Sequence, residues 1–388
     1  MNRTWATINL DALKFNIESV RKATSENAKV MAVVKADAYG HGVYEASKVF
    51  ISGGADCLAV ACLSEAKQLR KEGIDVPILI LGAIGIDETD EIVEYDITSA
   101  VFSYETAKAL SESAQKLNKT ATIHIKIDTG MSRIGILAGD RDADGISEIK
   151  KIASLPNIYI EGIFSHFSTS DELDGEYTKK QFDIFLSFTE KLEKEGISIP
   201  VKHIANSAAI ISYPEMHLNM VRAGIVLYGL YPSDDVDKER LPLIPAMSFK
   251  SRITMVKEMP KGRGVSYGKE YITEGTEKIA TVPVGYADGY TRNIAKKGSL
   301  LLSNGKTAKI IGRICMDQCM IDVTNVNNIS AGDEVTLFGD SVITADDVAK
   351  WSDSINYEVV CLISKRVPRV YLQDGKPVSV RNYIDELL

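Results

Sequence analysis

From about residue 30 to residue 230, short apolar and β-branched runs alternate with longer stretches of helical period. This alternation is typical of repeated βα units, which build parallel sheets covered by helices. The strand candidates number eight, the number that closes a (β/α)8 barrel. They are Val30–Lys35, Ala55–Cys62, Val76–Leu81, Ile97–Phe102, Thr122–Asp128, Ile158–Phe167, Lys202–Ala205 and Met220–Leu230. Helical stretches such as Tyr104–Leu117 and Glu176–Lys194 lie between them. We therefore predict an α/β fold with a TIM-type barrel.

The remainder of the chain has a different pattern. After Pro245, strand-like runs separated by turn signals replace the long helical stretches, and Asn304-Gly305 stands in a hairpin setting. The runs Ala308–Met316 and Gln318–Val323 are typical of strands. Thr344, with Asp347 three residues later, predicts one capped helix. We expect a barrel domain over residues 11–240 and a mostly β domain over residues 241–388.

Composition and charge limit the classes of function. The chain has 388 residues, 45% of them hydrophobic and 25% charged, which is enough for two domains with sizeable cores. The net charge of -8 disfavours nucleic acid as a partner, because such partners require a basic face. The sequence has neither an export signal at its start nor an apolar run of membrane-spanning length. No membrane partner is expected.

The cysteines point to a reducing compartment. There are five, an odd and small number, and in a chain without an export signal this predicts reduced thiols and a cytoplasmic location. Cys315 and Cys319 have no further Cys or His at ligand spacing nearby, so no metal site is expected.

A lysine stands where the first barrel strand ends. In barrels the catalytic groups project from the carboxyl ends of the strands, and Lys35 follows the apolar run that ends at Val34. Burial there would lower the pKa of the amine and free it to form a Schiff base with a carbonyl. A purely structural ion pair between Lys35 and Asp37 or another carboxylate fits the position equally well.

The ends of the seventh and eighth strands carry features of a phosphate site. Ser207 supplies a hydroxyl, and the backbone around Gly224 supplies N–H groups. Taken singly, Ser207 could be a helix N-cap and Gly224 a turn residue. A lysine and a phosphate site at one barrel mouth together favour pyridoxal phosphate as the cofactor.

Longer motifs add a resemblance to a known family. Val34-Lys35-Ala36-Asp37-Ala38-Tyr39-Gly40-His41-Gly42 resembles the cofactor-attachment signature of the alanine racemase family. The resemblance extends over both domains and nearly the whole chain. Its further motifs are Lys126–Arg133, Arg222–Gly224, Val265–Gly268 and Gly312–Asp317. It implies that the segment Trp5–Leu10, within residues 1–10, joins the C-terminal domain as a strand.

The resemblance implies roles for individual residues around pyridoxal phosphate. Lys35 is implied to form the Schiff base, His166 to lie beside the ring, and Arg222 to donate to the ring nitrogen. The residues implied to surround the phosphate are Tyr39, Ser207, Gly224, Ile225 and Tyr357. Without the resemblance, His166 would be a hydrogen-bonded histidine at a strand end, Tyr357 a packing residue, and Arg222 half of a surface salt bridge.

Racemisation requires an acid and a base on opposite faces of a planar carbanion. The resemblance implies that Tyr267 takes the α-proton of the L-enantiomer and Lys35 that of the D-enantiomer. Without the resemblance, Tyr267 would be an aromatic residue in a glycine-rich hairpin. Because a guanidinium donates hydrogen bonds without giving up its proton, Arg222 should leave the ring a weaker electron sink and limit side reactions.

Substrate contacts and assembly also follow from the resemblance. Arg133 and the backbone at Met316 and Asp317 are implied to bind the carboxylate, and Tyr286, with Tyr267 and Tyr357, to narrow the pocket so that alanine is preferred. Some members of the family carry a carbamylated lysine at the position of Lys126, and a plain ion pair of Lys126 with Asp128 is the alternative. The family arrangement is a homodimer in which each chain completes the site of the other.

The resemblance implies alanine racemisation that supplies D-alanine for peptidoglycan, and other functions compete with this interpretation. A cofactor-binding protein without turnover would lack the second domain, and a basic-amino-acid decarboxylase would need a catalytic cysteine that neither Cys315 nor Cys361 matches in pattern. A serine or broad-specificity racemase is the nearest alternative, since the pocket residues exclude it only weakly.

Overall fold

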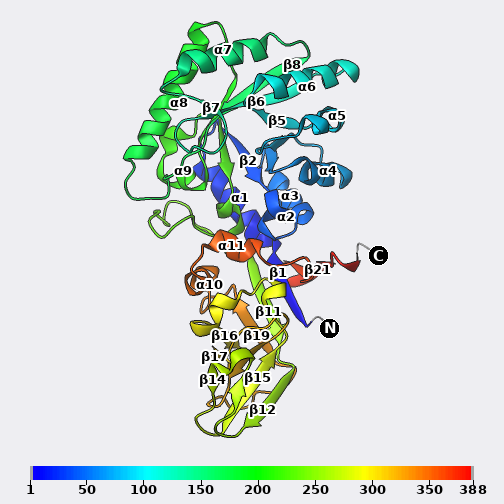
Figure 1. Ribbon diagram of the computed structural model, residues 1–388, viewed down its shortest axis with the longest axis vertical. Helices are drawn as coiled ribbons and strands as arrows, with labels where there is room; N and C mark the ends of the chain where they lie inside the picture. Colours follow the sequence, from blue (N-terminus) through cyan, green and yellow to red (C-terminus); the bar gives the residue numbers. More distant parts are fainter. Residues whose placement is uncertain (1–2, 386–388) are drawn as a thin grey trace. The chain divides into compact units, whose positions relative to one another are not determined.

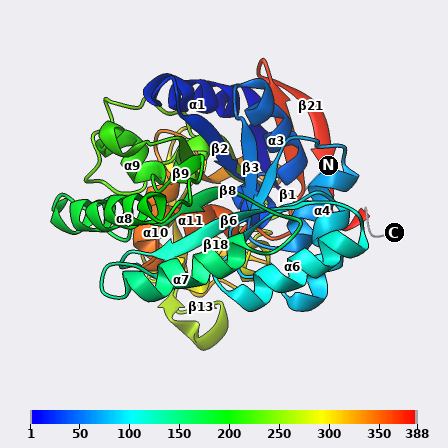
Figure 2. The ribbon, with the colours of Figure 1, turned by 90° about the horizontal axis from the view of Figure 1, so that it is seen from above.

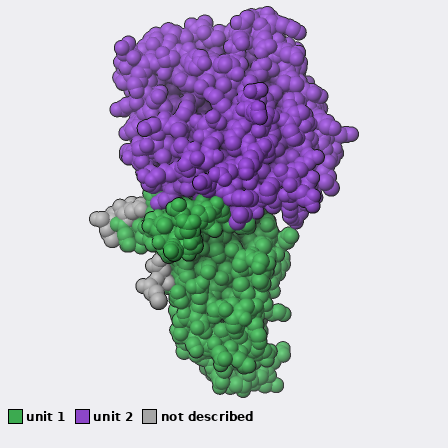
Figure 3. Space-filling model, turned by 180° about the vertical axis from the view of Figure 1, so that it is seen from behind, with its two compact units in different colours: residues 1–12, 39–42, 245–388 green, residues 13–38, 43–244 purple. Residues whose placement is uncertain are grey.

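The computed structural model describes residues 3–385, and these form two compact units (Figure 3). The barrel unit comprises Leu13–Ala38 and Val43–Ile244. The β unit comprises Met1–Ala12, Tyr39–Gly42 and Pro245–Leu388. A short piece of the chain just after Lys35 is therefore part of the β unit, although the sequence on both sides of it is part of the barrel unit.

The eight predicted strands of the barrel are confirmed. They are β2 (Lys29–Val33), β3 (Cys57–Val60), β4 (Ile78–Ile80), β5 (Thr98–Val101), β6 (Ala121–Asp128), β8 (Ile158–Phe164), β9 (Val201–His203) and β10 (Met220–Ala223). All neighbours pair in parallel in the order β10-β2-β3-β4-β5-β6-β8-β9, and a short β7 (Ile136–Leu137) pairs with β6. Backbone hydrogen bonds from Asn219 to Lys202 (3.1 Å) and from Arg222 to Ala205 (3.0 Å) join β10 to β9 and close the ring.

Helices surround the barrel strands (Figures 1 and 2). They are α1 (Leu10–Ala23), α3 (Val43–Ser52), α4 (Leu63–Lys71), α5 (Thr89–Glu94), α6 (Tyr104–Lys116), α7 (Asp142–Ala153), α8 (Glu176–Lys194) and α9 (Ser207–Ser212), with 3-10 turns η1 (Ile86–Glu88), η2 (Pro214–Met216) and η3 (Ile225–Tyr228). The sequence explains why α6 begins at Tyr104, because the side chain of Ser103 caps the first turn by accepting from the Thr106 N–H. Ala107, Leu110 and Ala114 then recur at helical spacing and are fully buried.

Most of the strands are somewhat shorter than predicted, and two end well before the expected residue. The run Met220–Leu230 stays a strand only to Ala223, because Gly224 turns the backbone (φ -111°, ψ -107°) into η3. The run Ala308–Met316 ends at Ile311, because Gly312 has a φ of +66°. A Cβ at Gly312 would lie 2.8 Å from the Val265 carbonyl oxygen, so only glycine fits that turn. Hydrophobicity continues through both turns, and for that reason the sequence pattern overestimated the strands.

The predicted mostly β second unit is confirmed. Its strands are β1 (Thr4–Asn9), β11 (Met247–Arg252), β12 (Met255–Met259), β15 (Glu277–Val282), β16 (Ser299–Leu302), β17 (Thr307–Ile311), β18 (Cys319–Asp322), β19 (Glu334–Phe338), β20 (Arg369–Gln373) and β21 (Lys376–Arg381). They form one sheet in the order β12-β15-β18-β17-β16-β19-β11-β1-β20-β21. Strand β1 pairs antiparallel with β11 and parallel with β20.

Smaller elements complete the β unit. A two-stranded ribbon joins β13 (Gly264–Val265) to β14 (Tyr271–Ile272). The helices are α10 (Ala345–Ser352) and α11 (Asn356–Cys361), with 3-10 turns η4 (Tyr267–Lys269), η5 (Tyr286–Asp288) and η6 (Arg292–Lys296). The capping box between Thr344 and Asp347 is present, as predicted, and the Asn304-Gly305 turn joins β16 to β17. Within residues 3–385, no helix is both long and apolar enough to cross a membrane.

Candidate active site

Lys35 opens a left-handed turn, labelled α2 (Lys35–Tyr39), directly after β2. Ala36, Asp37, Ala38 and Tyr39 all have φ between 52° and 55°, a conformation that costs an L-residue roughly 1–2 kcal/mol each. Glu65 accepts from the Ala36 N–H (2.7 Å), which fixes the start of the turn. Strain of this kind is typical of functional segments, because the surrounding structure must impose it.

Arg222 lies in β10 with only 3% of its surface exposed. Its Nη1 donates to Nδ1 of His203 (2.9 Å), and its Nη2 contacts the Ser165 carbonyl (2.8 Å), the Ile204 carbonyl (3.0 Å) and Nδ1 of His166 (3.0 Å). Among residues 3–385, no group accepts from the Nε–H and no carboxylate forms an ion pair with Arg222. The salt bridge considered from the sequence is therefore wrong, and the Nε–H, with one N–H of Nη1, remains for a ligand.

Positive charge is concentrated around His166. Burial lowers the pKa of His166 well below its usual range, and the charges of Arg222, Arg133, Lys126 and Lys35 lower it further. The imidazole is therefore neutral at pH 7. Gln181 of α8 donates to the His166 carbonyl (3.0 Å), which anchors the segment that follows β8.

Lys126 is a buried amine in β6, with 3% of its surface exposed. Burial, and then the charge of Arg222, lower its pKa to about 7. The amine donates to the Ile127 carbonyl (2.6 Å) and lies over the Phe164 ring. Asp128 accepts instead from the N–H groups of Gly130 and Ser132, so the predicted alternative of a Lys126–Asp128 ion pair is not formed. Arg133 follows that turn and is exposed.

Ser207 and Gly224 lie together in the barrel unit. The Gly224 N–H donates to the buried hydroxyl of Ser207 (3.0 Å), and Ile225 follows in η3. The N-cap of α9 is Asn206, whose side chain accepts from the Ala209 N–H, so Ser207 is not the cap that the alternative reading required. The hydroxyl is thus held by the turn itself.

In the β unit, Tyr267 stands in η4 between β13 and β14 and is 70% exposed. The preceding Ser266 has a φ of 64°, and its hydroxyl donates to the Arg313 carbonyl (2.7 Å). A cavity of about 610 Å³ includes Tyr267, Ser266, Cys315, Met316 and Asp317 in its lining. The unit therefore brings Tyr267 together with Met316 and Asp317, as the resemblance implied.

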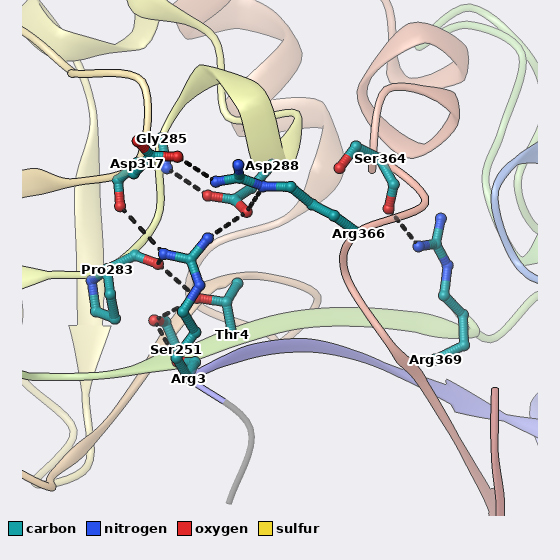
Figure 4. Close-up of polar contacts among 10 residues, drawn as sticks. All are labelled: Arg3, Thr4, Ser251, Pro283, Gly285, Asp288, Asp317, Ser364, Arg366 and Arg369. Atoms are coloured by element: carbon teal, nitrogen blue, oxygen red, sulfur yellow. Dashed lines mark hydrogen bonds and ion pairs between the residues drawn. The ribbon is translucent and has the colours of Figure 1, made fainter. Parts of the chain in front are cut away.

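A buried carboxylate organises the neighbouring backbone (Figure 4). Asp288, 1% exposed, accepts from Arg3 (2.9 Å), Arg366 (2.7 Å) and the Gly285 N–H (2.9 Å). Arg366 also pairs with Asp317 (2.6 Å).

Two further bonds fix the same region. The N–H groups of Tyr286 and Ala287 donate to the carbonyls of Cys315 (3.1 Å) and Met316 (3.0 Å). Tyr286 and the Met316-Asp317 backbone are thus held in one hydrogen-bonded frame, with the side chains of Tyr286 (42%) and Met316 (52%) substantially exposed.

Tyr39 and Tyr357 also meet inside the β unit. Their ring centroids are 6.2 Å apart, with Tyr357 in α11. Burial raises the pKa of Tyr39 far above its usual range, and Tyr357 adds to this. Tyr39 is therefore a neutral hydroxyl at any physiological pH.

Sequence reasoning missed several residues of these networks. His124, His203 and Glu161 are polar residues inside strand runs, and a buried polar residue in an apolar strand is itself a signal of a hydrogen-bonded network. Asp288 and Arg366 carry no local signal, because their partnership joins residues 78 positions apart.

Together these features define a class of protein. A (β/α)8 barrel that gathers a lysine amine and unbalanced positive charge at the carboxyl ends of its strands is an enzyme scaffold for anionic ligands. Among residues 3–385, no cluster of His, Cys, Asp or Glu could hold a metal ion.

Comparison with known proteins identifies the family. Residues 8–232 match the model of the alanine racemase N-terminal domain, and residues 246–371 that of the C-terminal domain. The alanine racemase of Clostridium tetani is 50% identical over 98% of each chain. The structure of alanine racemase from Clostridium difficile 630 has a TM-score of 0.95 at 46% identity, covering 99% of each chain. That of the Bacillus anthracis enzyme has a TM-score of 0.93 at 37% identity, covering 100% of this chain and 99% of that one. The chain belongs to the alanine racemase family.

Proposed function

We propose that this chain interconverts L-alanine and D-alanine with pyridoxal 5'-phosphate as its cofactor. The full-length similarity to alanine racemases supports the reaction. Within the molecule, the observation that carries the proposal is Arg222, a buried guanidinium whose terminal nitrogens are bound by the protein while its Nε–H is left to a ligand.

The residues present fit this cofactor in chemistry and charge. Arg222 offers one donor to a ring nitrogen, and a ring nitrogen that accepts from a guanidinium stays unprotonated. Ser207 and the N–H groups around Gly224 and Ile225 would hold the phosphate, with Tyr39 and Tyr357 as further proposed contacts. The excess of positive charge around His166 requires an anionic ligand to balance it.

When bound, pyridoxal phosphate supplies an electron-withdrawing ring that acidifies the α-proton of an amino acid. The remaining chemistry belongs to the protein. We assign Lys35 as the amine that carries the cofactor and exchanges the α-proton of D-alanine at Nζ. Tyr267 exchanges the proton of L-alanine at its phenolic oxygen on the opposite face. Neutral His166 accepts a hydrogen bond from Arg222 and so helps to orient the guanidinium without adding positive charge.

Substrate size and orientation are assigned to a second set of residues. Arg133 and the backbone of Met316 and Asp317 bind the substrate carboxylate. Tyr286, with Tyr267 and Tyr357, limits the side chain to about the size of a methyl group. This selection favours alanine over serine and lysine.

We further propose that the enzyme is a cytoplasmic homodimer with shared sites, supplying D-alanine for peptidoglycan. Tyr267, Tyr286 and Met316 expose 70%, 42% and 52% of their surfaces in a single chain. Exposed aromatic and methionine side chains grouped in one unit are typical of interface residues. A twofold partner would cover them.

The test is an assay of the purified holoenzyme with L-alanine, L-serine and L-lysine, reading product chirality. The expected result is D-alanine from L-alanine and L-alanine from D-alanine, with at least tenfold lower activity on serine. The Lys35→Ala variant should lose the activity and the cofactor's bound absorbance. Wild-type protein without alanine racemisation, or with serine as the better substrate, contradicts the proposal.

A further inference from the structure

A line of hydrogen bonds connects Arg222 to the interior of the barrel. Arg222 donates to Nδ1 of His203 (2.9 Å), and Nε2 of His203 lies 2.9 Å from Nδ1 of His124. Nε2 of His124 lies 3.0 Å from the carboxylate of Glu161. His203 and His124 are 0% and 1% exposed, whereas the Glu161 side chain is 31% exposed. We call these four residues the barrel relay.

The backbone of β6 and β8 leaves space for the side chains of the relay. The register between β6 and β8 shifts by one residue, because Ile123 lies opposite Ile160 and His124 lies opposite Gly162. A Cβ at Gly162 would lie 2.5 Å from Nδ1 of His124, so the ring occupies space that only glycine leaves open. The shift leaves Glu161 as the extra residue of β8, directly before the glycine that faces His124.

Phe164 supplies the apolar wall of the relay. Its ring stacks on the His203 ring at a centroid distance of 4.8 Å and an angle of 7°. The same ring lies 5.4 Å from the guanidinium carbon of Arg222. His203 and Arg222 are therefore held by packing against Phe164 as well as by hydrogen bonds.

Chemistry fixes the direction of every bond. A guanidinium has no acceptor, so Nδ1 of His203 must accept from Arg222. His203 then carries its proton on Nε2 and donates to Nδ1 of His124. His124 must in turn carry its proton on Nε2, and it donates to Glu161. Burial, and next the charge of Arg222, lower the pKa of His203 well below its usual range, which agrees with a neutral ring.

The relay cannot conduct protons. Each imidazole already has its single acceptor nitrogen occupied, and a proton could move toward Glu161 only if Arg222 gave one up. Burial lowers the pKa of Arg222 to about 9, so the guanidinium remains charged at neutral pH. The relay therefore holds its side chains in fixed orientations, with a cation at one end and a carboxylate at the other.

We infer that Glu161 is a positioning residue that acts through His124 and His203 to orient Arg222. The Glu161 end reaches a cavity of about 40 Å³ lined also by Lys29, Asp56 and Thr98, which stand at or next to the amino ends of barrel strands. Glu161 thus acts from the side of the barrel opposite the mouth. The consequence for turnover rests on the proposed function of Arg222, whereas the pattern of imidazole protons does not.

The imidazole protons can be observed directly. Nitrogen-15 NMR of histidine side chains in the holoenzyme distinguishes protonated from unprotonated ring nitrogens. We expect His124 and His203 both to carry their proton on Nε2. A wild-type spectrum with either proton on Nδ1, or with a charged ring, overturns the inference whether or not the protein racemises alanine.

Substitution of Glu161 then separates the hydrogen bond from the charge. Glu161→Ala should leave the proton of His124 on Nε2, because His203 still donates to its Nδ1, but it removes the acceptor of that N–H and should lower kcat by roughly two- to thirtyfold, the range for changes along a packed network, with a smaller change in KM. Glu161→Gln keeps an acceptor for His124 and should retain the tautomers and most of kcat. Because Gln preserves the shape of Glu, this variant also serves if Glu161→Ala folds poorly.

A matched control is available beside His203. Glu193 pairs with Lys202 (2.6 Å) and is 45% exposed, so Glu193→Ala removes a comparable carboxylate outside the relay. It should leave both tautomers and kcat unchanged. Wild-type kcat in Glu161→Ala, or an equal loss in Glu193→Ala, overturns the positioning role even if the tautomers are as expected.

Discussion

Arg222 illustrates how one side chain can be specified by many weak constraints. Its two terminal nitrogens contact two backbone carbonyls and two imidazoles, and no carboxylate of residues 3–385 neutralises it. The motif Arg222-Ala223-Gly224 identified the residue from the sequence. His203, His124 and Glu161 could not be assigned in that way, because their contact depends on the register shift between β6 and β8 and on registers between strands distant in sequence.

Replacement of Arg222 by lysine tests how much its planar, forked shape matters. Lysine has three donors on one nitrogen and cannot reach all four acceptors. Unpaired buried acceptors should lower the free energy of unfolding by about 1–3 kcal/mol, and kcat should fall at least tenfold. Urea unfolding and steady-state racemisation provide the two measurements.

Arg70 provides the control for Arg222. Arg70 likewise has four acceptors, the carbonyls of Ile74, Val76, Tyr95 and Asp96, but it lies away from the strand ends that carry the site. Arg70→Lys should reduce stability without reducing kcat. If Arg222→Lys behaved in the same way as Arg70→Lys, the catalytic assignment of Arg222 would be wrong.

Lys126 gives a prediction about pH. Its pKa of about 7 means that the unprotonated amine increases as the pH rises through 7, and only this form reacts with CO2 to give a carbamate and a proton. In carbon-13-labelled bicarbonate, we expect a carbamate signal that grows between pH 6 and pH 8 and disappears in Lys126→Met. Absence of the signal at pH 8 would contradict carbamylation at this position.

At the scale of elements, local signals were read correctly and turns between apolar runs were not. The capping box at Thr344 and the Asn304-Gly305 turn depend on a few adjacent residues, so the sequence sufficed. The ends of β10 and β17 depend on backbone angles at Gly224 and Gly312, which hydrophobicity does not report. The left-handed turn after β2 was likewise invisible, because nothing in alanine favours a positive φ.

That turn makes a testable prediction about stability. Ala36 is exposed and has a φ of 53°, so glycine removes the left-handed penalty at the expense of a more flexible unfolded chain. Ala36→Gly should change the free energy of unfolding by about 0 to +1 kcal/mol. Ala109→Gly, inside α6, should lower it by about 1 kcal/mol. Equal destabilisation by both substitutions, measured by urea unfolding, would show that the turn is not strained.

At the scale of the whole molecule, Lys35 belongs to the barrel unit and Tyr267 to the β unit. Composition, the eight strand candidates and the family motifs were enough to predict both folds. The motifs contain the proposed site residues Lys35, Arg222 and Tyr267. His166, Ser207, Tyr286 and Tyr357 lie outside the motifs and were assigned through the family resemblance. In the proposed dimer two chains complete that set, and the exposed Tyr267 is the main observation behind this proposal.

The central claim, that Lys35 and Tyr267 from two different chains form each racemase site, is tested most directly by mixing two inactive variants. Lys35→Ala and Tyr267→Ala chains are co-expressed, and hybrid dimers are verified by mass spectrometry. Each hybrid contains one doubly damaged site and one intact site, and random pairing makes about half the dimers hybrids. The account predicts recovery of roughly a quarter of wild-type alanine racemisation. Activity no higher than that of the two parents, in a sample that contains hybrids, would contradict it.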